Sequence, residues 1–168
     1  MTSTARLQLT TPSDREIVMT RVFDAPRHLV FECFRRPELL KRWLLGPPGW
    51  EMPVCEVAQN VGDNYRFVWR KADGEQMSIR GVCKEFDPPS RTVSTELMDG
   101  RPGQALVTTV FSEQAGKTTL TLTVLYESKE IRDAMLKTGM ERGVNASYDR
   151  LATLLASGEV QAGSPASA

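Results

Sequence analysis

The hydrophobic positions near the end of the chain follow the spacing of an α-helix. Between residues 129 and 157, large apolar side chains recur three or four positions apart: Leu136, Met140, Val144, Tyr148, Leu151 and Leu155. Residues at this spacing share one face, so the pattern predicts a single helix of about 28 residues, roughly 42 Å long. Ser128 is expected to cap its N-terminus and Gly158 to end it. A helix of this length can cross a whole sheet.

Two glycines lie beside this apolar stripe and are followed by further small residues. Gly139 and Gly143 fall about one turn apart, and Ala146 or Ser147 continues the row. A glycine inside a helix costs roughly 1 kcal/mol relative to alanine, so its presence needs a reason. One explanation is close packing of the helix against a sheet. The other is that the small side chains leave room for a ligand beneath the helix, and the sequence leaves both open.

From residue 54 onward the pattern changes to the period-two alternation of β-strands. Tyr65, Phe67 and Trp69 fall on one face of such a strand, and Asp73-Gly74 is a strong hairpin signal. The predicted strands are residues 16–23, 54–58, 65–70, 77–86, 92–97, 105–112 and 118–126. Two short helices with an apolar face are predicted between the first two strands, at residues 27–35 and 38–45.

The predicted order is one strand, two short helices, six strands and one long helix. Consecutive hairpins make an antiparallel sheet, and one face of it must be covered. Only the C-terminal helix is long enough to cover it. The sequence therefore predicts an α+β domain over residues 14–157, with a seven-stranded antiparallel sheet wrapped around the long C-terminal helix. Residues 1–13 are expected to form a flexible tail and residues 158–168 a disordered one.

Charge and cysteine content narrow the classes of partner. The 168 residues include 21 basic and 21 acidic side chains, so no net charge favours nucleic acid or an anionic membrane. No apolar run approaches the roughly 18 residues of a membrane span, and the N-terminal residues lack the apolar core of a signal peptide. The three cysteines are widely separated, as in a reduced protein. We therefore expect a cytoplasmic protein without nucleic-acid or membrane partners.

Motifs for metal binding and catalysis are missing from the sequence. His28 is the single histidine and no Cys-x-x-Cys motif occurs, which argues against zinc. The familiar motifs for a nucleophilic serine, a phosphate loop or a dinucleotide are absent as well. We expect no metal, no cofactor and no catalytic residue identifiable from sequence. Enzymatic activity would depend on carboxylates or Tyr65 in a pocket, so it stays open, while the sequence favours a binding protein.

Aromatic and apolar side chains are the candidate lining of a ligand cavity between the sheet and the long helix. Ligand pockets are mostly apolar and carry few polar groups. The simpler interpretation is that these side chains fill the core, with Trp43 and Trp50 forming a hydrophobic lid on either side of the loop at 46–49. The candidate lining residues are Trp43, Trp50, Tyr65, Phe67, Trp69, Met77, Ile79, Leu122, Met140 and Gly143.

Several short motifs occur in an order that is similar to that of a known family. They are Phe23-Asp24-Ala25-Pro26, Pro37-Glu38-Leu39-Leu40, Arg42-Trp43 with Gly46-Pro47, Asp73-Gly74, Gly81-Val82, Pro88-Pro89-Ser90-Arg91, Gly139-Met140-Glu141-Arg142-Gly143 and Ser147-Tyr148-Asp149-Arg150-Leu151. Over residues 15–156 the chain resembles the START-like (SRPBCC) superfamily. Within it, the chain resembles the branch named after the C-terminal domain of the activator of the heat shock protein 90 ATPase. The resemblance implies the helix-grip fold.

Three functions are compatible with these residues and this resemblance. The leading hypothesis is a non-enzymatic carrier or sensor of a small hydrophobic molecule, contained between the small-residue row and the aromatic strand face. The second is a co-chaperone-like protein-interaction module that activates a heat shock chaperone ATPase through the outer sheet face. The resemblance connects both of these with the stress response. The third is a cyclase or dehydratase, which would need an ionisable pair facing the cavity.

Overall fold

The computed structural model describes residues 6–160 and contains eight strands and four helices within that range. The strands are β1 (Gln8–Thr10), β2 (Glu16–Phe23), β3 (Trp50–Glu56), β4 (Asn64–Lys71), β5 (Gln76–Asp87), β6 (Arg91–Met98), β7 (Gln104–Gln114) and β8 (Lys117–Leu125). The helices are α1 (Arg27–Arg35), α2 (Pro37–Trp43), α3 (Lys129–Leu136) and α4 (Met140–Ala156).

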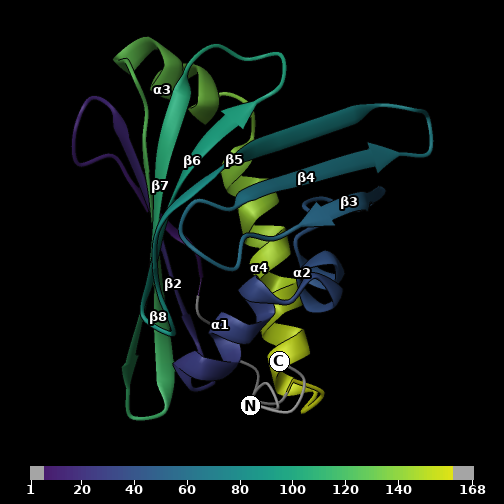
Figure 1. Cartoon of the computed structure of the whole chain (residues 1–168), viewed down its shortest axis with the longest axis vertical. Helices are drawn as coiled ribbons and strands as arrows, with labels where there is room; N and C mark the ends of the chain where they lie inside the picture. The colour runs from purple at the N-terminus through teal and green to yellow at the C-terminus, as the bar shows by residue number, and fades with distance from the viewer. Residues whose placement is uncertain (1–5, 161–168) are drawn as a thin grey trace.

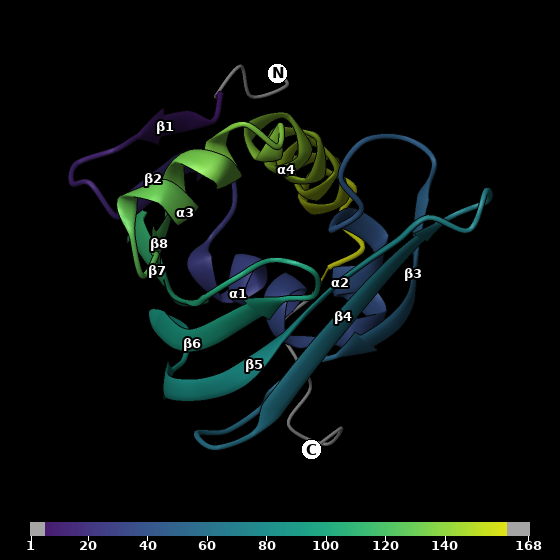
Figure 2. The same cartoon turned by 90° about the horizontal axis from the view of Figure 1, so that it is seen from above.

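The strands form one antiparallel sheet in the order β1-β2-β8-β7-β6-β5-β4-β3. Seen from above, the sheet curls around α1 and α2, while α3 and α4 close its open side (Figure 1, Figure 2). The hairpin of β4 and β5 extends beyond the rest of the sheet (Figure 1). This arrangement confirms the α+β architecture predicted from the sequence, including the two short helices after the first predicted strand.

Strand β1 distinguishes the observed sheet from the predicted one. The seven predicted strands are all present, with most ends shifted by a few residues. β1 pairs with β2, with Leu9 opposite Met19, inside the segment expected to be a flexible tail. Leu7 and Leu9 are partly buried against the core, so two alternating leucines anchor this short edge strand. The predicted count of seven strands is therefore corrected to eight for residues 6–160.

The C-terminal helix is interrupted, and the prediction of one continuous helix over residues 129–157 is wrong. Ser128 caps α3 as expected, because its hydroxyl accepts a hydrogen bond from the N–H of Ile131 at 3.1 Å. The chain then leaves the helix, and Gly139 has a φ of 82°, in the left-handed region that glycine enters without strain. The apolar spacing from Leu136 to Met140 continues across the break, which is why the period alone did not reveal it.

Two hydrophobic clusters fill the space between the sheet and the helices. The α4 cluster includes Phe23, Val30, Trp43, Leu120, Tyr148 and Leu151. The α3 cluster consists of Ile17, Met19, Ala105, Val124, Tyr126 and Met135. Val160, in the segment expected to be disordered, is buried in the α4 cluster. The rest of the two expected tails, residues 1–5 and 161–168, lies outside the described residues.

Candidate functional site

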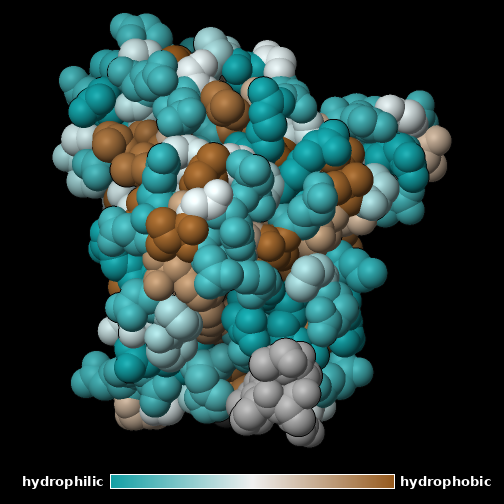
Figure 3. Space-filling view, in the orientation of Figure 1, coloured by the Kyte–Doolittle hydropathy of each residue, from teal (hydrophilic) through white to brown (hydrophobic). Residues whose placement is uncertain are grey.

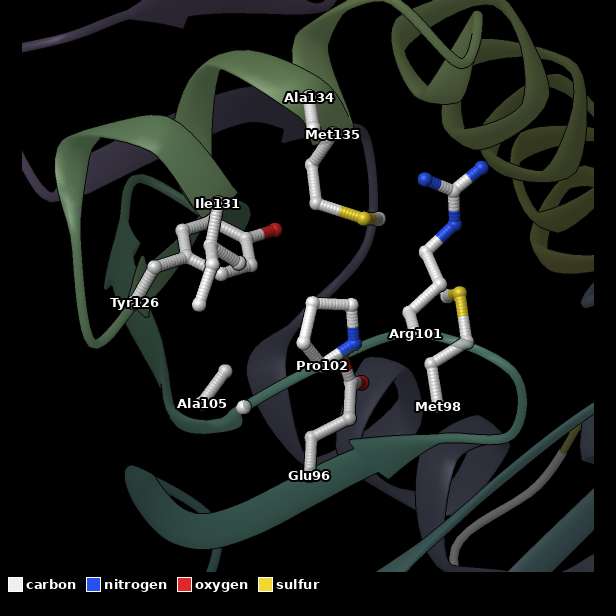
Figure 4. A pocket seen from close by; sticks show the side chains of 10 residues that line it. Glu96, Met98, Arg101, Pro102, Ala105, Tyr126, Ile131, Ala134 and Met135 are labelled. Carbon is white, nitrogen blue, oxygen red and sulfur yellow. The ribbon is translucent and has the colours of Figure 1, made fainter.

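A pocket lies between α3 and the adjoining part of the sheet, over the α3 cluster (Figure 4). It has a volume of about 40 Å³, which is room for a few water molecules or for one end of a small ligand. Its lining residues are Glu96, Met98, Arg101, Pro102, Gly103, Ala105, Tyr126, Ile131, Ala134 and Met135. The pocket therefore lies between the sheet and the first part of the C-terminal helical region.

Strand register brings the floor of the pocket together. Glu96 on β6 is opposite Ala105 on β7, and directly opposed residues project from the same face of a sheet. Met98 follows Glu96 at the period of two and shares that face. Because Ala105 is small, the space above it stays open beside the longer Glu96 side chain. Tyr126, which follows the end of β8, is the remaining residue on the sheet side of the pocket.

Helix α3 forms the opposite wall. Ile131 and Met135 are one turn apart and face the sheet, while Ala134 lies at the exposed rim. The helix is tied to the sheet by Arg132, whose guanidinium donates to the carbonyl oxygens of Ser13 at 2.7 Å and Glu16 at 3.3 Å. The position of this wall is therefore fixed by a buried, hydrogen-bonded arginine.

The loop between β6 and β7 closes one side of the pocket. A Cβ atom built on Gly103 would lie 2.8 Å from Cδ1 of Ile131, and Gly103 has a φ of 86°. The positive φ favours glycine, while the contact with the end of the Ile131 side chain shows how closely the loop backbone approaches α3. Pro102 and Arg101 precede it, and the Arg101 guanidinium points away from the Glu96 carboxyl (Figure 4).

Glu96 is the acid of the pocket, and its surroundings are unusual for a carboxylate. The residue is half-buried, and its carboxyl makes no hydrogen bond or ion pair with residues 6–160. Burial raises the pKa of this carboxyl from 4.5 to about 7, because an apolar environment disfavours the charged form. Burial and the nearby charge of Glu96 together raise the pKa of the Tyr126 hydroxyl. The site thus holds one ionisable acid whose charge changes near neutral pH.

None of the ten residues expected to line a cavity lines this pocket. Trp43 lies deep in the α4 cluster, and its indole N–H donates to the carbonyl of Cys33 at 3.0 Å. Leu122 and Met140 pack on the α3 cluster from its edge. A Cβ on Gly143 would have only Pro47 nearby, at 3.7 Å. Their predicted role in ligand binding stays a prediction.

The aromatic strand face predicted from the sequence does assemble. Tyr65, Phe67 and Trp69 lie in a row on β4, with centroids of successive rings 5.4 and 6.0 Å apart. On β5, Ile79 is opposite Phe67 and Met77 is opposite Trp69. The polar ends of two rings already have partners, since the Tyr65 hydroxyl donates to the Thr95 carbonyl and the Trp69 indole N–H donates to the Leu44 carbonyl, both at 2.6 Å.

At its outer end the aromatic face meets the edge of the sheet. The Lys71 ammonium lies 5.0 Å from the centroid of the Trp50 ring, and Met77 is 40% exposed. Tyr65 and Trp69 are buried, whereas Phe67 and Ile79 in the middle of the face are partly exposed. The solvent-accessible part of the face therefore includes Phe67 and Ile79 as well as Met77.

Sequence reasoning missed Glu96, although a signal for it exists. The segment 92–98 contains a single charged residue, Glu96, and its other residues are uncharged and mostly β-branched or apolar. Glu96 is the lone acid of this strand, and a loop with glycine and proline follows it. This pattern predicts a carboxylate near the end of a strand, where the sheet meets the loop. Its burial depends on where α3 lies, and that position follows from the helix break at Gly139.

Within residues 6–160, no group of three or more His, Cys, Asp and Glu side chains is arranged to hold a metal ion. Over the same residues, no helix has the length and apolar character needed to cross a bilayer.

Comparison with known proteins relates this architecture to a family. Residues 24–156 match the family described as "Activator of Hsp90 ATPase homolog 1-like protein". A protein from Rhodobacter sphaeroides is similar in structure, with a TM-score of 0.86 and 29% identity over 90% of this chain and 99% of that chain. A protein from Chromobacterium violaceum has a TM-score of 0.75 and 25% identity over 85% and 98% of the two chains.

A more distant neighbour has the same fold. The AHSA1-like protein from Aeromonas hydrophila has a TM-score of 0.68 and 17% identity, over 83% of this chain and 93% of that chain. No curated protein matches the chain.

Proposed function

Since the chain belongs to the activator of Hsp90 ATPase homolog 1-like family, we propose that it is a non-enzymatic carrier or sensor that binds a small, mainly apolar molecule in the pocket beneath α3. The observation that carries this proposal is a pocket with mainly apolar walls that contains one carboxyl, that of Glu96, without a partner in the described part of the chain. Ligand sites typically combine an apolar lining with a few polar groups that orient the ligand.

The composition of the walls supports an apolar ligand. Met98, Pro102, Ile131 and Met135 surround the space and offer little to hydrogen-bond with. Methionine side chains are flexible and polarisable, so they adapt to ligands of different shape. The two methionines come from opposite walls, β6 and α3, and the pocket can widen by a change of their rotamers.

A screen by thermal shift and by NMR against small apolar and amphipathic compounds tests this proposal. A ligand that binds only the folded chain raises the melting temperature as its concentration rises. The variant Ala134→Trp places a large ring at the exposed rim and should abolish binding while the fold is kept. Ala72→Trp, in the exposed turn of the β4–β5 hairpin, is the matched control and should bind normally.

The same screen separates this pocket from the aromatic face. We propose Trp69→Phe and Met140→Leu as the variants that report on the lining expected from the sequence. Loss of binding in these two variants, with normal binding in Ala134→Trp, would place the ligand on the aromatic face. Binding that is unchanged in all three variants would contradict both locations.

A second candidate is a protein-interaction module of the chaperone-activator kind, which a feature of the outer sheet favours. Arg66 on β4 and Arg80 on β5 are directly opposite each other, an arrangement that is destabilising for like charges. Asp99 pairs with Arg80 at 2.7 Å and offsets part of this charge. The face of the molecule seen in Figure 3 is largely hydrophilic, with separate apolar patches. Recognition of a partner by Arg66 and Arg80 would depend on charge.

An ATPase assay with a heat shock protein 90 chaperone from the same organism tests this candidate. Stimulation that is lost in Arg66→Glu/Arg80→Glu, and kept in an Arg91→Glu control, would support it. No stimulation at saturating concentrations of the protein would exclude it.

A further inference from the structure

Among residues 6–160, the Glu96 carboxyl has no counter-ion, and it lies in a mainly apolar pocket. We propose that the pocket selects the ammonium group of a small primary amine with an apolar body, and that Glu96 is its counter-ion. This inference rests on the proposed ligand-binding function and names the ligand class of the same site.

The absence of a partner for Glu96 carries the argument. Its carboxyl makes no hydrogen bond or ion pair with the described residues, whereas other acids such as Asp149 and Glu32 each contact an arginine. The one basic residue of the lining, Arg101, is on the rim with its guanidinium turned away (Figure 4). A buried carboxylate is costly unless a cation compensates it. An ammonium group in the pocket would supply that compensation.

The remaining lining fits an alkylammonium better than an anion or a neutral molecule. The Tyr126 hydroxyl makes no hydrogen bond with residues 6–160, so its oxygen can accept one from an ammonium N–H. Ala105, Ile131 and Met135 offer apolar contact for a short alkyl chain. An anion would be repelled by Glu96, and a neutral molecule would leave its charge uncompensated. The volume of about 40 Å³ limits the amine to a few heavy atoms.

The charged groups around Glu96 set the expected pH dependence. Among the lining residues, Arg101 lies at the rim on the β6–β7 loop and Tyr126 follows the end of β8, whereas α3 contributes only apolar side chains. Tyr65 on β4 lies outside the lining, and burial together with the charge of Glu96 raises the pKa of its hydroxyl. The pKa of Glu96 is raised to about 7 by burial. An ammonium binds the ionised form, which is about 90% of the molecules at pH 8 and roughly 1% at pH 5. Affinity for an amine should therefore fall about a hundredfold between pH 8 and pH 5.

Three probes of one shape test the inference: n-butylamine, n-butanol and butyrate. Each is titrated into the isotopically labelled full chain at pH 8 and pH 5 and at constant ionic strength, with backbone chemical shifts as the readout. We expect n-butylamine to bind at least tenfold more tightly than n-butanol at pH 8, with shifts centred on Glu96, Ala105 and Met135. The preference should disappear at pH 5 and in Glu96→Gln. Glu56→Gln, at an exposed strand position, should keep it.

The outcomes separate this inference from the proposed function. If n-butanol binds the pocket as tightly as n-butylamine at pH 8, amine selection is wrong and the ligand-binding proposal stands. Amine binding that is independent of pH also overturns the inference, and this measurement needs no variant. If no probe and no compound of the wider screen shifts the pocket resonances, the ligand-binding proposal fails together with it.

Discussion

The guanidinium of Arg21 donates a hydrogen bond to the carboxylate of Asp149 at 2.7 Å and joins β2 to α4. Arg21 is 4% exposed, whereas the side chain of Asp149 is 63% exposed. The guanidinium carbon also lies 5.4 Å from the centroid of the Phe23 ring, and Nε has no hydrogen-bond partner among the described residues. A nearly buried positive charge therefore depends on one carboxylate that reaches in from the surface.

Removing that carboxylate should destabilise the fold. Asp149→Ala leaves the buried guanidinium without its ionic partner, and we expect a loss of about 2 kcal/mol in the free energy of unfolding. The double variant Arg21→Met/Asp149→Ala removes the charge as well and should lose less than Asp149→Ala alone. Urea denaturation measures both values. Asp24→Ala, at an exposed aspartate that forms no ion pair with the residues the structure describes, is the control, and an equal effect of Asp24→Ala and Asp149→Ala would contradict this account.

The raised pKa of Glu96 should make stability depend on pH. Its carboxyl has a pKa of about 7 in the folded chain, against an ordinary value of 4.5, so the folded state binds more protons between these values. The free energy of unfolding should therefore fall as pH rises from 4.5 to 7 and remain lower above 7. Glutamine has no charge to bury, so Glu96→Gln should be more stable than wild type by roughly 2 kcal/mol at pH 8, allowing for partial exposure.

This difference should shrink towards zero at pH 4.5, where the wild-type carboxyl is protonated in the folded chain. Denaturant unfolding of both proteins at the two pH values measures it, because the contributions of all other groups cancel in the comparison. Glu56→Gln, at an exposed position, is the control and should change the free energy of unfolding little at either pH. A Glu96→Gln variant that is less stable than wild type at pH 8 would show that the carboxylate has a partner.

Two glycines of the C-terminal segment should respond to alanine in opposite directions. Gly139 has a φ of 82°, so Gly139→Ala forces a left-handed alanine and should cost about 1 kcal/mol. Gly143 lies within α4, and its nearest neighbour would be Cδ of Pro47 at 3.7 Å, an ordinary contact. Gly143→Ala should therefore stabilise the chain by about 0.5–1 kcal/mol. Thermal and urea unfolding compare the pair, and a shift of the same sign in both would argue for one continuous helix.

The three cysteines should differ in reactivity. Burial raises the pKa of the Cys33 thiol to about 12 and that of Cys55 to about 11, and it also raises the pKa of Cys83. Cys33 and Cys83 are buried, whereas Cys55 is partly exposed. With iodoacetamide at pH 8, Cys55 should be alkylated first and at least tenfold more slowly than in the unfolded chain. Peptide mass spectrometry over time follows each site, and early modification of Cys33 would contradict its position in the core.

Local sequence patterns predicted the sheet because its hairpins are encoded by adjacent residues. Asp73-Gly74 lies at the β4–β5 turn, and the alternation of Tyr65, Phe67 and Trp69 fixed which side chains share a face. The pocket could not be predicted in the same way. Its opening depends on the small Ala105 facing Glu96 from the neighbouring strand, and on a helix wall whose direction is set by the backbone at Gly139.

For the aromatic face, the sequence predicted which side chains share a face but not how tightly they are packed. Its residues were correctly placed on one side of the strands, but alternation does not report what packs on them. The Trp69 indole N–H binds the Leu44 carbonyl, and Phe67 packs against the α4 cluster, so long-range contacts decide how much of the face is filled. Burial of a strand face is predictable from sequence. A cavity next to that face is not, because it depends on how closely the side chains of two opposing surfaces fit together.

The break between α3 and α4 divides the C-terminal segment into parts of unequal local stability. Met135 of α3 belongs to one hydrophobic cluster, and Tyr148 and Leu151 of α4 belong to the other. Because the two helices share no continuous hydrogen-bond ladder, α3 can open without unfolding α4. We expect the amides of α3 to exchange with deuterium faster than those of α4, and a molecule bound in the pocket to slow exchange in α3 but not in α4. Ligand binding in the pocket would then be detectable as a more ordered α3.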